Sequence, residues 1–129
     1  MYTGSVPYEC YEKSGSNSKI TTITSTQSES DLVVMIKQGD ILVRNAYIKA
    51  GDKYSFLLPN GTYQVFFYSG RGWNPGKAMP NGLKGGFVTD ESYSKDSPTS
   101  LSYQEMVYEL ILQQNGNFST QQSSEDEIF

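Results

Sequence analysis

The sequence predicts an all-β protein, a two-sheet antiparallel β-sandwich of about seven to nine strands. Apolar and polar residues alternate with a period of two in several segments, as they do in strands with one buried face. These segments are rich in β-branched and aromatic residues, which favour strands. Turn residues separate them roughly every eight to twelve residues, a spacing typical of sandwiches and barrels. We expect one domain over residues 1–129, a length that suits a single hydrophobic core.

The clearest pattern lies in residues 53–69, where aromatic and apolar residues alternate with other residues on both sides of a turn. The turn consists of Pro59, which has a fixed φ, Asn60, which tolerates the left-handed region, and Gly61, which adopts positive φ freely. We therefore predict two strands joined as a β-hairpin, around which the other strands are organised.

Residues 1–18 are predicted to form an irregular lead-in, with glycine, serine and proline scattered among aromatic residues. We expect Tyr8 and Tyr11 to pin this segment to an edge of a sheet. Cys10 is the only cysteine, so it cannot form an internal disulfide. A reactive thiol at Cys10 would need a nearby cation or helix end, and Lys13 alone is thin support for one.

Two strands and a return strand are predicted before the central hairpin. Residues 19–26 are rich in threonine and isoleucine and form a short strand. The apolar run at 32–37 indicates a central strand covered on both faces. A tight turn at 38–40 then leads into a return strand over 41–49, and residues 50–52 turn into the hairpin.

After the hairpin, the glycine-rich segment 70–86 is predicted to be a long loop, and loops of that length are often functional. Residues 87–89 are a candidate short strand, and 90–100 is a polar stretch. The segment 101–114 fits either a helix or a strand, and its period of two favours the strand. Residues 119–129 are a polar C-terminal tail.

The composition argues against several classes of partner. The net charge is −4 and only 19% of the residues are charged, so we expect no basic surface for nucleic acid. No apolar run approaches the roughly 18 residues of a membrane-spanning helix, and the N-terminus has no signal-peptide pattern. Direct membrane insertion is therefore not expected. The sandwich type and the low charge favour an extracytoplasmic or cell-envelope location.

The absence of histidine excludes Ser-His-Asp and Cys-His catalysis and histidine-bearing zinc sites. Asp90, Glu91 and Asp96 lie close in sequence but lack the ligand spacing of an EF-hand, so a solvated acidic loop is favoured over a calcium site. We predict a protein that is not an enzyme and that has no cofactor or metal. A hydrolase built on two carboxylates is a distant alternative.

The predicted ligand-binding residues are Tyr68, Arg71, Trp73 and Asn74, at the end of the second hairpin strand and in the loop after it. An aromatic face beside planar donors suits stacking on a sugar or gripping a peptide. The alternative interpretation is that Trp73 plugs one end of the sandwich and Arg71 covers it.

Ten tyrosines give a second hypothesis of the same kind. Half of the tyrosines on the predicted strands should point outward, and a flat tyrosine-rich face can bind extended polymers or proteins. The alternative is that these side chains fill the faces of the sheets and direct their hydroxyls to water. The tyrosines placed on predicted strands are Tyr54, Tyr63, Tyr68, Tyr103 and Tyr108.

Three stretches, NAYIKAGDKYSFLLPNGTYQVFFYSGRGWNP, LKGGFVTDESYSKD and YELILQQNGNFST, resemble a C-terminal all-β domain family of Bacteroidetes-type bacteria. The resemblance covers the chain from about Asp31 to the C-terminus. It implies a bacterial module attached to other domains, and it transfers no catalytic residues because the family has no established activity. Relatives tend to carry histidine at Asn45 and an extra cysteine near Asn81. More loosely, the strand–PNGTY–strand unit is similar to sandwich domains of the prealbumin and carboxypeptidase-regulatory type, at the level of fold alone.

The favoured hypothesis is a non-catalytic interaction module that binds a protein or glycan partner through the loop around Trp73. The alternative is a purely structural spacer or assembly domain whose edge strands pair with other chains.

Overall fold

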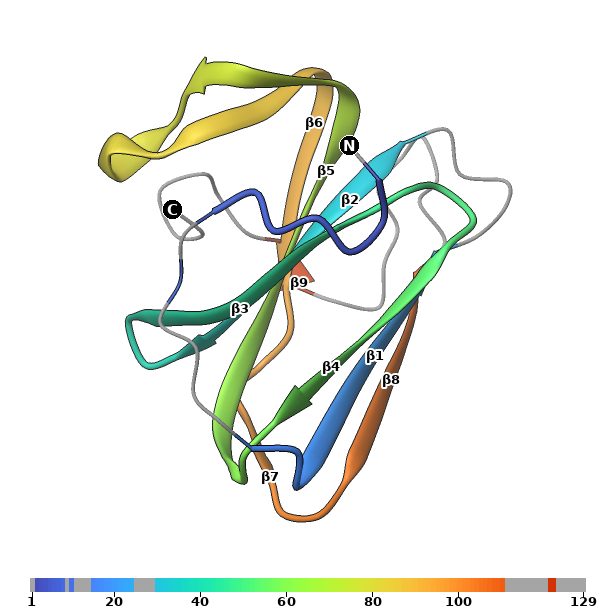
Figure 1. The fold of residues 1–129 in the computed structure, drawn as a ribbon, viewed down its shortest axis with the longest axis vertical. Helices are drawn as coiled ribbons and strands as arrows, with labels where there is room; N and C mark the ends of the chain where they lie inside the picture. The colour runs from blue at the N-terminus through green and yellow to red at the C-terminus, as the bar shows by residue number, and fades with distance from the viewer. Residues whose placement is uncertain (1, 9, 11–14, 25–29, 111–120, 123–129) are drawn as a thin grey trace.

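A computed structural model describes residues 2–8, 10, 15–24, 30–110 and 121–122 of the chain. The described residues form nine strands and one short 3-10 helix, η1 (Figure 1). In chain order the strands are β1 (Ser18–Thr24), β2 (Asp31–Gln38), β3 (Ile41–Ile48), β4 (Lys53–Leu58), β5 (Gly61–Ala78), β6 (Lys84–Lys95), β7 (Thr99–Leu101), β8 (Glu105–Leu110) and β9 (Gln121–Gln122). Helix η1 (Pro80–Gly82) lies between β5 and β6.

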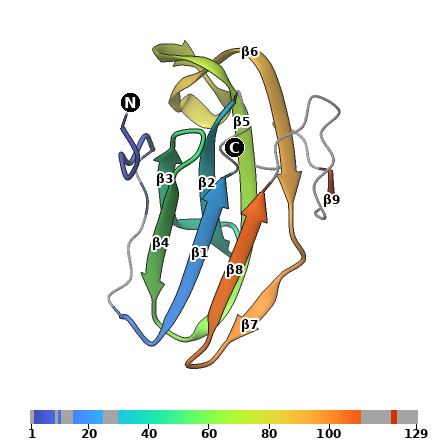
Figure 2. The ribbon, with the colours of Figure 1, turned by 90° about the vertical axis from the view of Figure 1, so that its right-hand side faces the viewer.

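The strands form two packed sheets, which confirms the predicted all-β sandwich (Figures 1 and 2). The small sheet has the order β4-β1-β8, and the large sheet has the order β3-β2-β5-β6-β9, with β7 also paired to β5. One pair departs from the predicted antiparallel arrangement, because β1 and β8 run parallel. Residues 105–110 are a strand, as the period of two favoured, and the rest of the predicted strand, 111–114, lies outside the described residues.

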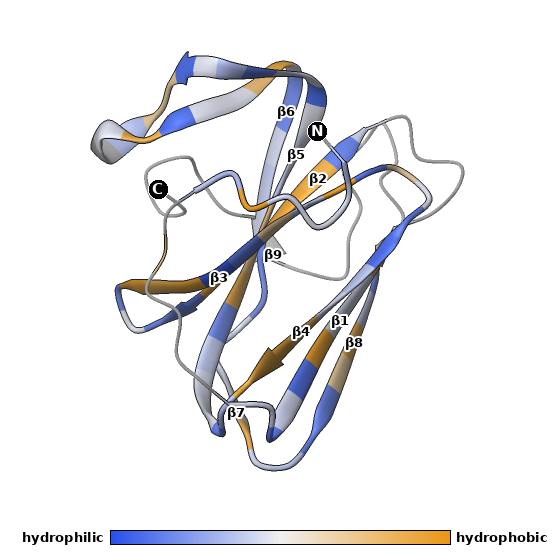
Figure 3. Ribbon diagram, in the orientation of Figure 1, coloured by the Kyte–Doolittle hydropathy of each residue, from blue (hydrophilic) through white to orange (hydrophobic). Residues whose placement is uncertain are grey.

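The main core lies between the two sheets. On β2, Leu32, Val34 and Ile36 point into this core and are fully buried. Strand β2 lies between β3 and β5 in the large sheet, which confirms the prediction of a central strand covered on both faces. Much of the hydrophobic colouring in Figure 3 falls on β2 and β3.

The predicted hairpin at residues 53–69 is wrong in its pairing, although both of its strands exist. Strand β4 pairs with β1 in the small sheet, whereas β5 pairs with β2 and β6 in the large sheet. The Pro59–Asn60 corner therefore carries the chain from one sheet to the other. Phe56 on β4 and Val65 on β5 face the same core from opposite sides. A period of two shows which face of a strand is buried, but it does not distinguish paired strands from facing strands.

The predicted loop at 70–86 is also wrong. Strand β5 continues to Ala78 and β6 begins at Lys84, so this segment is mostly a two-stranded ribbon (Figure 1). We call the part of β5 and β6 between Gly70 and Asp90 the ribbon. The pairing register shifts between Ser69 and Arg71, where the ribbon bends. A Cβ at Gly70 would lie 2.5 Å from the Cβ of Phe87, so glycine is needed for the close approach rather than for an open loop.

The ribbon covers the outer face of the large sheet and forms a second core there. Val33, Met35 and Phe66 of the sheet are buried in a cluster with Met79 and Phe87 of the ribbon segment. The polar stretch predicted over 90–100 is also partly strand, because β6 extends to Lys95.

The lead-in runs along the edge of β3. The Gly4 amide donates to the Tyr47 carbonyl and the Tyr47 amide donates to the Ser5 carbonyl, each at 2.8 Å. Farther along, the Asn45 side chain exchanges two hydrogen bonds with the backbone of Tyr8. The predicted anchoring of the lead-in by Tyr8 is confirmed, and Tyr11 lies outside the described residues. Within the described residues, no helix has the length and apolar character to span a membrane.

Candidate functional site

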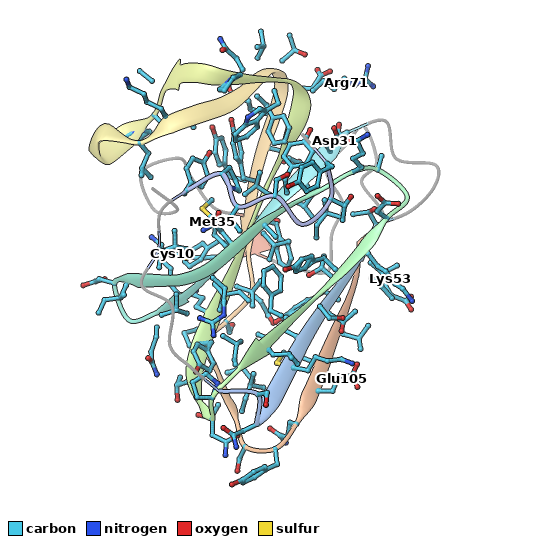
Figure 4. All side chains as sticks on the ribbon, viewed as in Figure 1. Cys10, Asp31, Met35, Lys53, Arg71 and Glu105 are labelled. Carbon is cyan, nitrogen blue, oxygen red and sulfur yellow. The ribbon has the colours of Figure 1, made fainter. Side chains whose placement is uncertain are left out.

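The four predicted site residues all lie on β5, but the structure gives them different environments. Tyr68 is 0% exposed, Trp73 is half-buried, and Arg71 and Asn74 are exposed. Arg71 lies where the ribbon bends away from the large sheet (Figure 4). The expectation that Tyr68 offers a ring face to a ligand is therefore corrected, because its side chain is closed off by the ribbon.

Tyr68 belongs to a hydrogen-bond network centred on Glu91. Its hydroxyl donates to Glu91 Oε2 at 2.6 Å and accepts from the Phe87 amide at 2.8 Å. The Tyr93 hydroxyl donates to the same carboxylate oxygen at 2.9 Å. Lys77 Nζ donates to Glu91 Oε1 at 2.8 Å and to the Phe87 carbonyl at 2.7 Å. This network, which we call the Glu91 network, fastens the ribbon to the sheet.

The protonation states in the network follow from these contacts. Burial and the hydrogen bond to Glu91 raise the pKa of Tyr68 above its ordinary value of about 10. Burial alone would raise the pKa of Glu91, but hydrogen bonds from Lys77, Tyr68 and Tyr93 outweigh it and lower the pKa on balance. At neutral pH the network is therefore a carboxylate anion held by a lysine cation and neutral phenols.

Trp73 is packed against the second core. Its ring meets the rings of Phe87, Tyr47 and Tyr8 edge-on, with centroids 5.1, 5.5 and 6.2 Å away. A Cβ at Gly85 would lie 2.7 Å from the indole, so the opposite strand fits closely over it. The indole Nε1 is buried and has no hydrogen-bond partner among the described residues. Trp73 therefore packs inward, as the alternative interpretation held, but it does so against the second core on the outer face of the large sheet and not at an end of the sandwich, and Arg71 pairs with Asp90.

The exposed residues of the ribbon are accessible to a partner. Arg71 forms an ion pair with Asp90 at 3.4 Å, and Asp90 has a positive φ of 56° at the bend. Asn74 accepts a hydrogen bond from the Gly76 amide, and the Val88 side chain is 59% exposed. We call Arg71, Trp73, Asn74, Val88 and Asp90 the ribbon surface.

Tyrosine hydroxyls also bind two other carboxylates. The Tyr108 hydroxyl donates to Asp96 Oδ2 at 2.6 Å, and the Tyr47 hydroxyl donates to Asp31 Oδ2. Asp96 and Glu91 lie in one acidic stretch of the sequence, but they accept hydrogen bonds from different tyrosines. Within the described part of the chain, no group of three or more acidic or thiol side chains could hold a metal ion.

The sequence pattern missed the partners in the Glu91 network and the conformation of Tyr103. Glu91 and Tyr93 are two residues apart on β6, and this spacing was the only signal that they share a face with Tyr68. Tyr103, predicted to lie on a strand, instead occupies the turn between β7 and β8 with a φ of 50° and 76% exposure.

Comparison with protein-family models, with curated proteins and with solved structures found no match to this chain. The resemblance to a C-terminal domain family of Bacteroidetes-type bacteria therefore stays a prediction.

Proposed function

We propose that this protein is a non-catalytic interaction module that binds a protein or glycan partner through the ribbon surface. The observation that carries the proposal is the fastening of the ribbon by the Glu91 network, which fixes the strands that carry the exposed side chains. A surface that is ordered before binding avoids much of the entropy cost of association.

The exposed groups suit recognition. Arg71 carries a planar guanidinium whose Nε pairs with Asp90, and Asn74, three residues farther along β5, carries a side-chain amide nitrogen that can donate. Val88 adds exposed apolar area, and the half-buried Trp73 supports the ribbon from below. Arginine and tryptophan are the residue types that most often contribute strongly to interfaces.

The charged groups that converge at the ribbon are occupied with one another, which favours binding over catalysis. Lys77 is paired with Glu91, and both oxygens of that carboxylate accept hydrogen bonds. A general base or nucleophile would need a pKa suited to its task and a path to substrate, whereas the pKa of Glu91 is lowered by its donors.

The alternative, a spacer whose edge strands pair with other chains, is less favoured in the large sheet. Residues 2–8 occupy part of the β3 edge. On the ribbon, the backbone groups of Gly85 and Phe87 are occupied by side chains of Tyr8, Tyr68 and Lys77. Such coverage discourages pairing with a strand from another chain.

The test uses Trp73, the only tryptophan, as a fluorescent reporter of the ribbon. Titration with panels of glycans and peptides is expected to give a saturable change that Arg71→Ala and Asn74→Ala each weaken at least tenfold. Both side chains are exposed, so the melting temperature should stay close to that of the wild type. Lys53→Ala on the small sheet is the control and should bind normally.

Two results would contradict the proposal. One is a titration that is identical in wild type and both ribbon variants. The other is no response to any member of either panel combined with self-association in a dilution series by sedimentation, which would favour the spacer.

A further inference from the structure

The end of the sandwich opposite the ribbon carries no charged side chain in the three segments that build it. These are residues 15–18, 59–62 and 98–104, which lie before β1, at the β4–β5 corner and around β7 (Figure 2). The whole chain has 10 basic and 14 acidic residues, and none of them falls in these segments. The segments consist mostly of serine, threonine, asparagine, glutamine, glycine and proline. Lys19 and Glu105, which directly follow two of these segments, form an ion pair with each other at 3.8 Å. We call the surface of the three segments the neutral end.

Hydrogen bonds join the three segments into one ordered surface. Asn60 Oδ1 accepts from the Tyr103 amide at 2.9 Å and from Ser18 Oγ at 3.1 Å. Ser18 Oγ in turn accepts from the Gln104 amide at 3.2 Å. The neutral end is therefore held by the sandwich itself rather than by a single loop.

Tyr103 is the prominent side chain at the neutral end. Its φ of 50° lies in the left-handed region, which is unfavourable for a residue with a large side chain. The residue is 76% exposed, so little burial offsets this strain. Strained residues that the surrounding structure holds in place often mark binding sites. Here the Asn60 side chain holds the backbone of Tyr103.

Polar side chains with unused hydrogen-bonding groups lie next to Tyr103 in the sequence or bond to its backbone. The amide nitrogens of Asn60 and Gln104 and the hydroxyl of Ser102 have no hydrogen-bond partner in the part of the chain that the structure describes. Ser102 and Gln104 flank Tyr103 in the sequence, and the Asn60 side chain accepts a hydrogen bond from the Tyr103 backbone amide. An exposed ring on a turn that also carries amide and hydroxyl side chains can contact both the apolar face and the hydroxyls of a sugar.

We propose that the neutral end is a second binding site, and that its ligand is an uncharged oligosaccharide that stacks on Tyr103. Nucleic acids and acidic glycans need cations, which these segments do not contain. The charged groups of an ordinary protein surface would lose hydration here without gaining a partner of opposite charge. A neutral sugar needs no cation and has no charged group to dehydrate, and the side-chain amides of Asn60 and Gln104 can bind its hydroxyls. This site is separate from the ribbon surface, and it does not depend on the function proposed for the ribbon.

The test is affinity electrophoresis of the whole chain in gels that contain starch, xylan, galactomannan or mixed-linkage β-glucan, with polygalacturonate as the acidic comparison. At least one neutral polymer should retard the wild type, and Tyr103→Asn should abolish that retardation. Calorimetry with an oligosaccharide of the retarding polymer should show at least tenfold weaker binding for this variant. Asparagine tolerates the left-handed region, so the melting temperature should be unchanged or higher, which separates lost binding from unfolding.

Tyr2→Asn is the matched control, because Tyr2 is 74% exposed and belongs to the lead-in along β3, outside the three segments of the neutral end. This variant should be retarded like the wild type. The proposal is overturned if none of the four neutral polymers retards the protein, or if Tyr103→Asn leaves retardation intact. Loss of retardation in Arg71→Ala but not in Tyr103→Asn would also overturn it, and would instead place the glycan on the ribbon surface.

Discussion

The two ends of the sandwich use aromatic residues and charge in opposite ways. At the ribbon end, Trp73 is packed among other rings and charged groups are paired, as in the Lys77–Glu91 ion pair. At the neutral end, Tyr103 is exposed on a strained turn and its polar neighbours carry no charge. At the ribbon end, therefore, the ring of Trp73 stabilises the fold through packing. At the neutral end, the side chain of Tyr103 is accessible to a ligand.

The comparison also separates two uses of unusual backbone. At the ribbon end, Gly70 and Gly85 permit close packing that any larger residue would disturb. At the neutral end, a tyrosine occupies a conformation that glycine or asparagine would adopt more easily. The requirements of stable packing explain glycine at positions 70 and 85, but they do not explain tyrosine at position 103.

The largest expected effect is alkaline unfolding. Burial raises the pKa of Tyr8, Tyr47, Tyr68 and Tyr108 in the folded protein. Above about pH 10 these phenols ionise in the unfolded chain but stay protonated in the fold, so the free energy of unfolding falls as the pH rises. Denaturant midpoints measured between pH 8 and 11.5 should decrease steeply. A constant midpoint over this range would contradict the burial of these hydroxyls.

Gly70→Ala should cause the next largest effect, about 2–3 kcal/mol of destabilisation through overpacking. The added Cβ would meet Phe87 and force the ribbon away from the sheet. Chemical denaturation measures the loss, and a red shift of Trp73 emission reports the movement of the ribbon. Gly76→Ala is the control, because its Cβ would meet only Asn74 Oδ1 at 3.6 Å. Equal effects of the two changes would refute the close-packing account of Gly70.

Glu91→Gln should destabilise the protein by about 1–2 kcal/mol at pH 7, because charge-assisted hydrogen bonds become neutral ones and Lys77 loses its anion. The pKa of Glu91 is lowered in the fold, so its contribution is complete above the unfolded pKa near 4.3 and disappears as the pH falls through the folded pKa. The difference between variant and wild type should therefore shrink below pH 4. Thermal melts from pH 3 to pH 7 measure it.

Tyr103→Asn should have the smallest effect on stability, a gain of about 0.5–1 kcal/mol from relief of backbone strain. Tyr103→Ala removes the same ring but keeps a side chain that disfavours positive φ, so it should leave stability nearly unchanged. Urea denaturation of both variants separates backbone strain from ring packing. Clear destabilisation by Tyr103→Ala would indicate that the ring contributes to the fold, contrary to its exposure.

Much of the secondary structure could be predicted because it depends on local alternation. Strand β2, the turn at Gly39 and the return along β3 follow from an apolar run, a residue with positive φ and a second apolar segment. The anchoring of the lead-in by Tyr8 could be predicted as well. Of the predicted ligand-binding residues, Arg71 and Asn74 are exposed and Tyr68 is buried, and binding by this segment stays a prediction.

The errors have a common physical cause. The alternation of apolar and polar residues around Phe56 and Val65 shows that one face of each strand is buried. The same alternation is expected whether the two strands pair in one sheet or face each other across a core. Glycine at positions 70 and 85 has two uses, an open loop or a close approach, and only the position of Phe87 or Trp73 distinguishes them.

The sequence by itself determined the all-β class, the strand faces that are buried and the lack of histidine-based chemistry, because composition and a period of two are local properties. Tertiary structure decided which strands pair, the folding of the ribbon onto the outer face, and the opposite fates of Trp73 and Tyr103. These features depend on contacts between residues far apart in the chain, such as Tyr8 with Gly85 and Asn60 with Tyr103, and local patterns carry no record of such contacts.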